Sequence, residues 1–181
     1  ALRGDAPKGQ DRFTPHDDGF VNSVELIEAI AARGDMTIRV GAYPEPHPDS
    51  ADGDADVAWL KRKIDAGATS AITQFFFDND SYERYVERVR RAGIYVPIVP
   101  GIVPIHNFSA VRNFASKCGA SIPAWLADRF DGLDRDPHTH SLVAAAVAAE
   151  QAAVADDPPQ AEVHDDAQDR QRRREGSAAG T

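Results

Sequence analysis

The run of residues 70–78, Ser-Ala-Ile-Thr-Gln-Phe-Phe-Phe-Asp, constrains the fold of this chain more than any other stretch. Gly67, just before it, can adopt the left-handed conformation that ends a helix, and the turn residues 78–81 can cap the next one. A short apolar run rich in β-branched and aromatic residues between such signals is typical of a strand buried on both faces of a parallel sheet. Gln74 places a polar amide near the carboxyl end of this strand, where ligands bind in parallel α/β folds.

The patterns on either side of this run alternate between helix and strand. Apolar spacing, caps and breakers predict helices at 21–33, 52–66, 81–92, 110–117, 123–130 and 137–154, and strands at 36–42, 70–78 and 96–103, with the end of a further strand at 1–5. This order indicates βαβ units around a parallel sheet. About four such units are present, whereas a closed (β/α)8 barrel needs eight. Periodicity therefore leaves two alternatives, a small open α/β sheet or part of a barrel.

The composition divides the chain into two parts. With 181 residues, of which 42% are hydrophobic, the chain can bury one core, which predicts a single domain over residues 1–155. Residues 156–181 combine charges, proline and glycine without an apolar period, which predicts a disordered tail. The abrupt change of composition at residue 156 is the change expected of a truncated or frame-shifted tail. The absence of an initiator methionine is what we expect of a chain that begins inside a larger protein.

The charge and the cysteine content exclude several classes of function. A net charge of −9 and a pI near 5.0 argue against nucleic acid as a partner, because a phosphate backbone requires clustered Lys and Arg. The basic run 170–174 is interpreted as a solvated charge run, since acidic residues flank it. Cys118 is the single cysteine, which suits a reducing compartment. We expect a cytoplasmic chain without a membrane span, and no metal site because the histidines are scattered.

Polar side chains follow each predicted strand at its carboxyl end. They are Asp5, Tyr43 with His47, Gln74, and the pair Pro100-Gly101 with Asn107. The carboxyl ends of parallel strands meet at one rim, as an active site on a barrel requires. For Asp5 a turn cap is an equally good interpretation, and for His47 a structural hydrogen bond is a fair alternative. Gln74 is harder to explain as scaffold, because an amide at the end of an apolar strand must find polar partners.

An ordered set of motifs resembles the methylenetetrahydrofolate reductase family. The motifs, which occur in the family's order from residue 1 to about residue 153, are Leu2-Arg3-Gly4-Asp5, Ala42-Tyr43-Pro44-Glu45-Pro46-His47-Pro48, Leu60-Lys61-Arg62-Lys63-Ile64-Asp65-Ala66-Gly67-Ala68, Ile72-Thr73-Gln74-Phe75-Phe76-Phe77-Asp78, Pro100-Gly101-Ile102-Val103-Pro104 and Ile122-Pro123-Ala124-Trp125. The resemblance implies a (β/α)8 barrel that holds FAD and takes hydride from NADH or NADPH. It further implies reduction of 5,10-methylenetetrahydrofolate to 5-methyltetrahydrofolate for methionine biosynthesis, by a homo-oligomer.

The resemblance also implies site residues. The positions that match FAD contacts are Arg3, Gly4, Asp5, Tyr43, His47, Ser50, Asp56, Arg62 and Lys63, and those that match substrate contacts are Asp5, Gln74 and Phe114. Arg62 and Lys63, on one predicted helix, can neutralise the diphosphate of the cofactor. Tyr43 offers a surface for a ring, and Asp56 can accept a hydrogen bond from a hydroxyl group.

Asp5 is the catalytic residue that the resemblance implies. A carboxylate near the flavin disfavours the anionic reduced form, makes it a stronger hydride donor, and stabilises a cationic folate iminium. By the same resemblance, Gln74 contacts the nicotinamide and the folate in turn, and Phe114 packs on the folate.

Parts of the family pattern have no counterpart in this chain. They are the general-acid glutamate near the end of the family's first barrel strand and the last strand with its substrate-binding arginine. Two interpretations therefore stay open. Either the chain contributes the FAD-cradling, folate-facing half of the reductase, or it is a non-catalytic fragment that acts at most as a flavin-binding or dimerising module.

Overall fold

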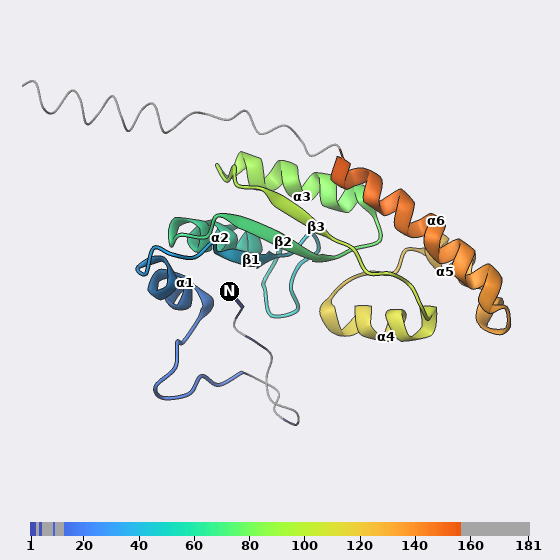
Figure 1. Ribbon diagram of the computed structural model, residues 1–181, viewed down its shortest axis with the longest axis horizontal. Helices are drawn as coiled ribbons and strands as arrows, with labels where there is room; N and C mark the ends of the chain where they lie inside the picture. The colour runs from blue at the N-terminus through green and yellow to red at the C-terminus, as the bar shows by residue number, and fades with distance from the viewer. Residues whose placement is uncertain (3, 5–8, 10–12, 157–181) are drawn as a thin grey trace, which may run out of the picture.

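The computed structural model of the chain describes residues 1–2, 4, 9 and 13–156 (Figure 1). Two predicted site residues, Arg3 and Asp5, lie outside the described residues, so their roles stay predictions. The tail predicted for residues 156–181 also lies outside them, except for Asp156, the last residue of the last helix.

Helices and strands alternate as far as the last described strand. The elements are α1 (Ser23–Ala31), β1 (Arg39–Ala42), α2 (Gly53–Asp65), β2 (Ser70–Phe75), α3 (Asn79–Arg91), β3 (Ile98–Gly101), α4 (Phe108–Cys118), α5 (Ala124–Phe130), the 3-10 helix η1 (Leu133–Arg135) and α6 (Pro137–Asp156). The strands form a parallel sheet in the order β1-β2-β3, which confirms the α/β class. Each predicted helix is present, and the predicted strands are shortened at their ends.

The strand end predicted at residues 1–5 is not among the described strands. The backbone nitrogen of Ala1 instead donates a hydrogen bond to the carbonyl of Arg39, and the side chain of Leu2 lies beside Gly41. Three strands rather than four are thus described, with Ala1 and Leu2 running along the outer edge of β1.

A short polar side chain caps the start of each of the helices α1 to α4. Asn22, Asp52, Asp78 and Asn107 each accept hydrogen bonds from backbone N–H groups of the first turn of α1, α2, α3 and α4, respectively. These side chains satisfy donors that a helix leaves unpaired, which is why the sequence signals located the helix starts closely. Gly67 follows α2 with a φ of 121°, the left-handed region predicted for it.

The first of two hydrophobic clusters joins the sheet to α1, α2 and α3. Val40, Ala71 and Ile98 from the strands pack with apolar residues such as Leu60 and Val89 from the helices. These helices therefore cover one face of the sheet. We call this part, from α1 to β3, the sheet region.

The other face of the sheet is open among the described residues. Ile72 of β2 and Val99 of β3, which are paired in the sheet, are each 41% exposed. The prediction that the strand at 70–78 is buried on both faces is therefore wrong. An apolar run shows that a strand can be buried, but the cover must come from other elements, and no described element lies on this side.

The second cluster lies beyond the carboxyl end of β2. Phe75 and Phe77 pack there with Phe108, Leu126 and Phe130 from α4 and α5, and α6 adds Val147. Figure 1 shows α4, α5 and α6 gathered at the end of the molecule opposite α1 and α2. We call this part, from α4 to α6, the helical region.

The strand pairing is irregular where the two regions meet. The register between β2 and β3 shifts between Ile72 and Phe75, and the amide of Gly101 donates to the hydroxyl of Thr73 at 2.8 Å. A Cβ at position 101 would lie 2.2 Å from the carbonyl oxygen of Thr73, so only glycine fits. Bulges of this kind are frequent next to functional sites, and this one lies beside Gln74.

Candidate functional site

A cleft of about 1010 Å³ opens along the free edge of β1. Its walls come from the open face of the sheet, the loop after β1, one side of α2 and the segment that precedes α1. The predicted site residues that line it are Gly4, Tyr43, His47, Ser50, Asp56, Lys63 and Gln74. The structure thus brings most of the described candidates together in one cavity.

Asp56, in the first turn of α2, organises the loop after β1. Its side chain is only 7% exposed. One carboxylate oxygen accepts a hydrogen bond from the backbone of His47 at 2.8 Å, and the other accepts one from the hydroxyl of Ser50. Three prolines keep this loop out of regular structure, so the carboxylate supplies the partners that its polar groups need.

Lys63 is a buried cation that lines the cleft. It is 7% exposed, and its Nζ donates a hydrogen bond to the carbonyl of Gly41 at 3.0 Å. Burial lowers the pKa of Lys63 to about 8, and the nearby carboxylate of Asp56 opposes that shift. An ammonium group has three donors, so one carbonyl bond leaves capacity for an anion. A buried lysine is costly to keep charged, which makes a functional partner the better explanation.

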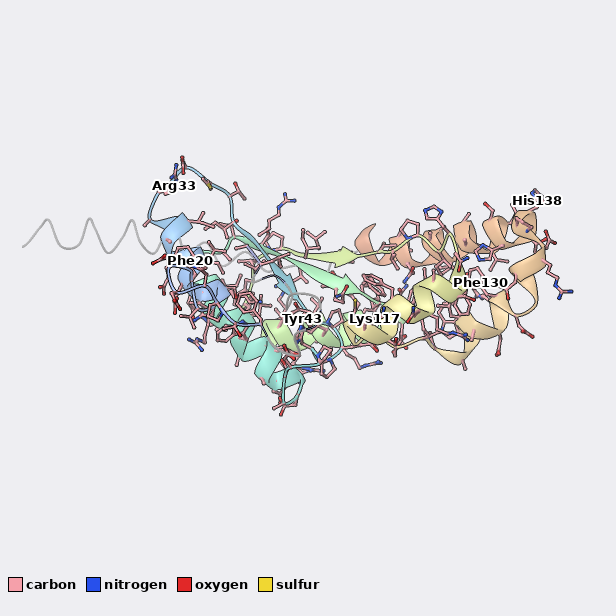
Figure 2. The ribbon with its side chains drawn as sticks, turned by 90° about the horizontal axis from the view of Figure 1, so that it is seen from below. Phe20, Arg33, Tyr43, Lys117, Phe130 and His138 are labelled. Atoms are coloured by element: carbon pink, nitrogen blue, oxygen red, sulfur yellow. The ribbon has the colours of Figure 1, made fainter. Side chains whose placement is uncertain are left out.

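Tyr43 and His47 form the aromatic part of the cleft. Their rings meet edge to face with centroids 4.7 Å apart, and Nζ of Lys63 lies 5.9 Å from the centre of the tyrosine ring. Nδ1 of His47 accepts a hydrogen bond from the amide of Asp49 at 3.0 Å, which leaves Nε2 as a donor in the neutral ring. Figure 2 shows Tyr43 near the middle of the long axis, with Phe20 and Arg33 toward one end and Phe130 and His138 toward the other.

Gln74 occupies the end of β2 on the open face of the sheet. It is half-buried, and its Oε1 accepts a hydrogen bond from the amide of Phe75 at 3.0 Å. This bond orients the side chain and leaves the NH2 group as the donor for a ligand.

The structure does not bring every predicted residue into the cleft. Arg62 is exposed, and its guanidinium stacks on the ring of Trp59 at 4.4 Å rather than lining the cavity. Phe114, on α4, is 52% exposed and stacks on Phe75 with centroids 5.4 Å apart, outside the cleft lining. Its predicted contact with folate stays a prediction.

Trp59 was not among the predicted site residues, although it lines the cavity together with Asp56 and Lys63. The signal was available, because these three residues follow each other at spacings of three and four along α2, which places them on one helix face. Asn22 and Ser23 at the start of α1 also line the cleft and carried no such signal.

Two further properties concern the described part of the chain as a whole. No three His, Cys, Asp or Glu side chains of the described residues lie close enough together to hold a metal ion. None of the described helices is long and apolar enough to cross a membrane.

Comparisons with known proteins agree with the motifs. The family model described as "Methylenetetrahydrofolate reductase" matches residues 1–164. The 5,10-methylenetetrahydrofolate reductase of Escherichia coli (strain K12) is 47% identical over 148 residues, which cover 82% of this chain and 48% of the relative. "Methylenetetrahydrofolate reductase (NADH) 1" of Zea mays is 41% identical over 144 residues, covering 74% of this chain and 24% of the relative.

A solved structure shares the fold at low sequence identity. It is described as an uncharacterized protein from Clostridium thermocellum that binds two copies of 5-methyl-5,6,7,8-tetrahydrofolic acid. The TM-score is 0.52 and the identity 18%, over 81% of this chain and 53% of the other. The likeness supports the arrangement of helices and strands described above.

Proposed function

Because the chain belongs to the methylenetetrahydrofolate reductase family, we propose that it forms the flavin-holding, folate-facing part of an enzyme that reduces 5,10-methylenetetrahydrofolate to 5-methyltetrahydrofolate with NADH or NADPH. The chain spans about half the length of the bacterial relatives it matches, so the complete reaction is part of this proposal. The names of the matching family and relatives support folate one-carbon reduction. The use of FAD and of NADH or NADPH is a further part of the proposal, which the experiment below tests.

The buried ammonium of Lys63 is the observation that carries the proposal. A cleft of about 1010 Å³ is large enough for a dinucleotide, and one of its lining residues is a cation with spare donors. Tyr43 supplies a ring surface, His47 a donor and Gln74 an amide, so the set of side chains fits FAD. Bound flavin would supply hydride transfer to the folate.

In this proposal the residues of the chain bind FAD and orient its rings. Asp56 fixes the loop after β1, so Tyr43 and His47 reach the cleft in a defined position. Lys63 neutralises a diphosphate, and Gln74 directs its NH2 group to a ring at the strand end. Asp5 stays the proposed catalytic carboxylate, and Arg3 a proposed flavin contact.

The open face of the sheet fits a partial barrel. In a (β/α)8 barrel the strands are covered by helices outside and by one another's side chains inside. The exposed pair of Ile72 and Val99 suits that inside face. We include a partial (β/α)8 barrel in the proposal, together with a cytoplasmic homo-oligomer as its assembly.

Anaerobic flavin spectroscopy tests the proposed function. The purified chain is incubated with FAD, separated from free flavin by gel filtration, and then mixed with NADH or NADPH. We expect retained flavin absorbance that one of the nucleotides bleaches. Retained flavin that neither nucleotide bleaches would instead support a non-catalytic flavin-binding module. A folded chain that elutes without flavin would contradict both.

A further inference from the structure

Trp59 is a half-buried aromatic residue of the cleft that the binding roles above do not use. It lies on α2, three residues after Asp56 and four before Lys63, and all three line the same cavity. Arg62, which is itself exposed, places its guanidinium over the indole at 4.4 Å. This contact holds the ring in one orientation and covers one of its faces. A planar ligand can stack on the other.

The cleft extends through two layers of the molecule. Ile72 and Gln74 line it on the open face of the sheet, whereas Trp59 lines it from the helix layer that covers the opposite face. Lys63 connects the two layers, because it belongs to α2 and reaches the carbonyl of Gly41 on the edge strand. A ligand that fills the cleft thus meets an amide, a cation and an indole.

FAD has groups that suit these three partners, because it contains two planar rings joined by a diphosphate. We propose that Trp59, backed by Arg62, is the stacking surface for the adenine ring of the dinucleotide. This inference rests on the proposed function, which places the diphosphate at Lys63 and the flavin ring toward Gln74. Arg62 then contributes to cofactor binding through the indole rather than through the diphosphate.

The helical region contains a matched pair for comparison. Arg129 of α5 stacks on Trp125 at 4.8 Å, the same chemistry as the pair on α2, but Trp125 does not line the cleft. The chain has only these two tryptophans. A Trp125→Phe variant therefore reports the fluorescence of Trp59 alone, and Trp125→Ala controls for the loss of an arginine-stacked indole.

The test compares FAD, FMN and ADP by calorimetric titration. FMN lacks the adenine half, and ADP lacks the flavin half. We expect Trp59→Ala to weaken FAD and ADP binding about tenfold, since base–aromatic stacking is worth roughly 1–3 kcal/mol, and to leave FMN binding within about twofold. Trp59→Phe should keep most of the affinity, and Trp125→Ala all of it. In Trp125→Phe, ADP should quench the remaining tryptophan fluorescence, which tests the contact without altering Trp59.

The outcomes separate this inference from the proposed function. FAD and FMN affinities that fall equally in Trp59→Ala, or ADP that leaves the fluorescence of Trp59 unchanged, would overturn the stacking role while flavin binding stands. ADP binding that depends on Trp59, in a chain that binds no FMN or FAD, would support the adenine site and contradict the flavin proposal. A folded wild-type chain that binds none of the three ligands would overturn both.

Discussion

The sheet region and the helical region bury similar apolar side chains but differ in the polar groups they bury. The sheet region encloses the ionisable pair Asp56 and Lys63 at the wall of a cleft. In the helical region the buried polar residue among those described is Gln151, whose amide donates to the carbonyl of Phe76. A buried amide with a backbone partner needs no ligand, whereas a lysine with a lowered pKa and spare donors fits one. This difference is why we propose that a ligand binds in the sheet region and that the helical region supports it.

The contacts between the regions agree with this division. The side chain of Asn79 on α3 donates to the carbonyl of Glu150 on α6 at 3.1 Å. The exposed ion pair of Arg129 with Glu150 lies within the helical region, so it does not join the two regions, and exposed pairs of this kind contribute little stability. Gln151 and the aromatic cluster thus account for most of the attachment of α6 to the end of β2.

Truncation of a buried core side chain in either region should produce the largest expected effect, a loss of stability. Leu126→Ala in the helical region and Leu60→Ala on α2 each remove a fully buried side chain, and each should lower the free energy of unfolding by about 3 kcal/mol. Only Leu60→Ala should also weaken FAD binding to the folded protein, because α2 carries Asp56, Trp59 and Lys63. Urea denaturation and FAD titration measure the two quantities. Equal losses of FAD affinity in both variants would remove the distinction between the regions.

Removal of the buried ammonium of Lys63 should produce the second-largest effect, a loss of FAD affinity. Lys63→Met should weaken FAD binding about 30-fold, since a hydrogen bond to a charged group is worth roughly 1.5–3 kcal/mol. Lys61→Met is the matched control, because the side chain of Lys61 is 41% exposed on the same helix and pairs with Asp65. Its FAD affinity should equal that of the wild type, as measured by quenching of flavin fluorescence. A control that loses as much affinity as Lys63→Met would show that general charge, and not the buried site, attracts the cofactor.

The pH dependence of FAD binding should follow the pKa of Lys63. The pKa is lowered to about 8, so the ammonium is charged below that pH and is lost as the pH rises through it. FAD affinity should therefore be highest at neutral pH and about tenfold weaker near pH 9. The same titration series with Lys63→Met should be flat. An affinity that rises with pH in the wild type would contradict the assignment of the cation to the diphosphate.

The smallest expected effect concerns the link between the two regions. The carboxylate of Glu45, in the loop after β1, accepts hydrogen bonds from the amide and the hydroxyl of Ser121. Because the contact is exposed, Glu45→Gln and Ser121→Ala should show a coupling energy below about 1 kcal/mol in a double-mutant cycle. FAD affinity should fall by about twofold, as the loop that carries Tyr43 and His47 loosens. An additive cycle would show that the loop is held by Asp56 alone.

The local parts of this account could be predicted from the sequence. Caps such as Asp52 and Asp78 and the stop at Gly67 locate the helices, because these side chains and this backbone act on their nearest neighbours. The alternation of strand and helix patterns predicted the α/β class, because these patterns also depend on residues that are close together in the sequence. The motifs located most of the cleft, since Tyr43 and Lys63 both line it.

The tertiary parts could not be predicted in this way. Burial of the strand at 70–78 depends on elements outside it, and the open face around Ile72 became visible only in the structure. Arg62 and Lys63 were assigned the same role, yet adjacent residues on a helix point about 100° apart, so one faces the cleft and the other does not. Phe114 was placed by motif alone, whereas its position depends on how α4 packs on Phe75.

The most direct test of the central claim is the reactivity of Lys63 toward an amine-acylating reagent near pH 8, measured by mass spectrometry with and without FAD. Its lowered pKa makes a larger fraction of Lys63 neutral and reactive than is usual for lysine. The account predicts that FAD slows acylation of Lys63 about tenfold, in line with the energy of a charge-assisted contact, and leaves exposed Lys61 unchanged. Acylation of Lys63 at the same rate in the presence of saturating FAD would show that the dinucleotide does not occupy this cleft.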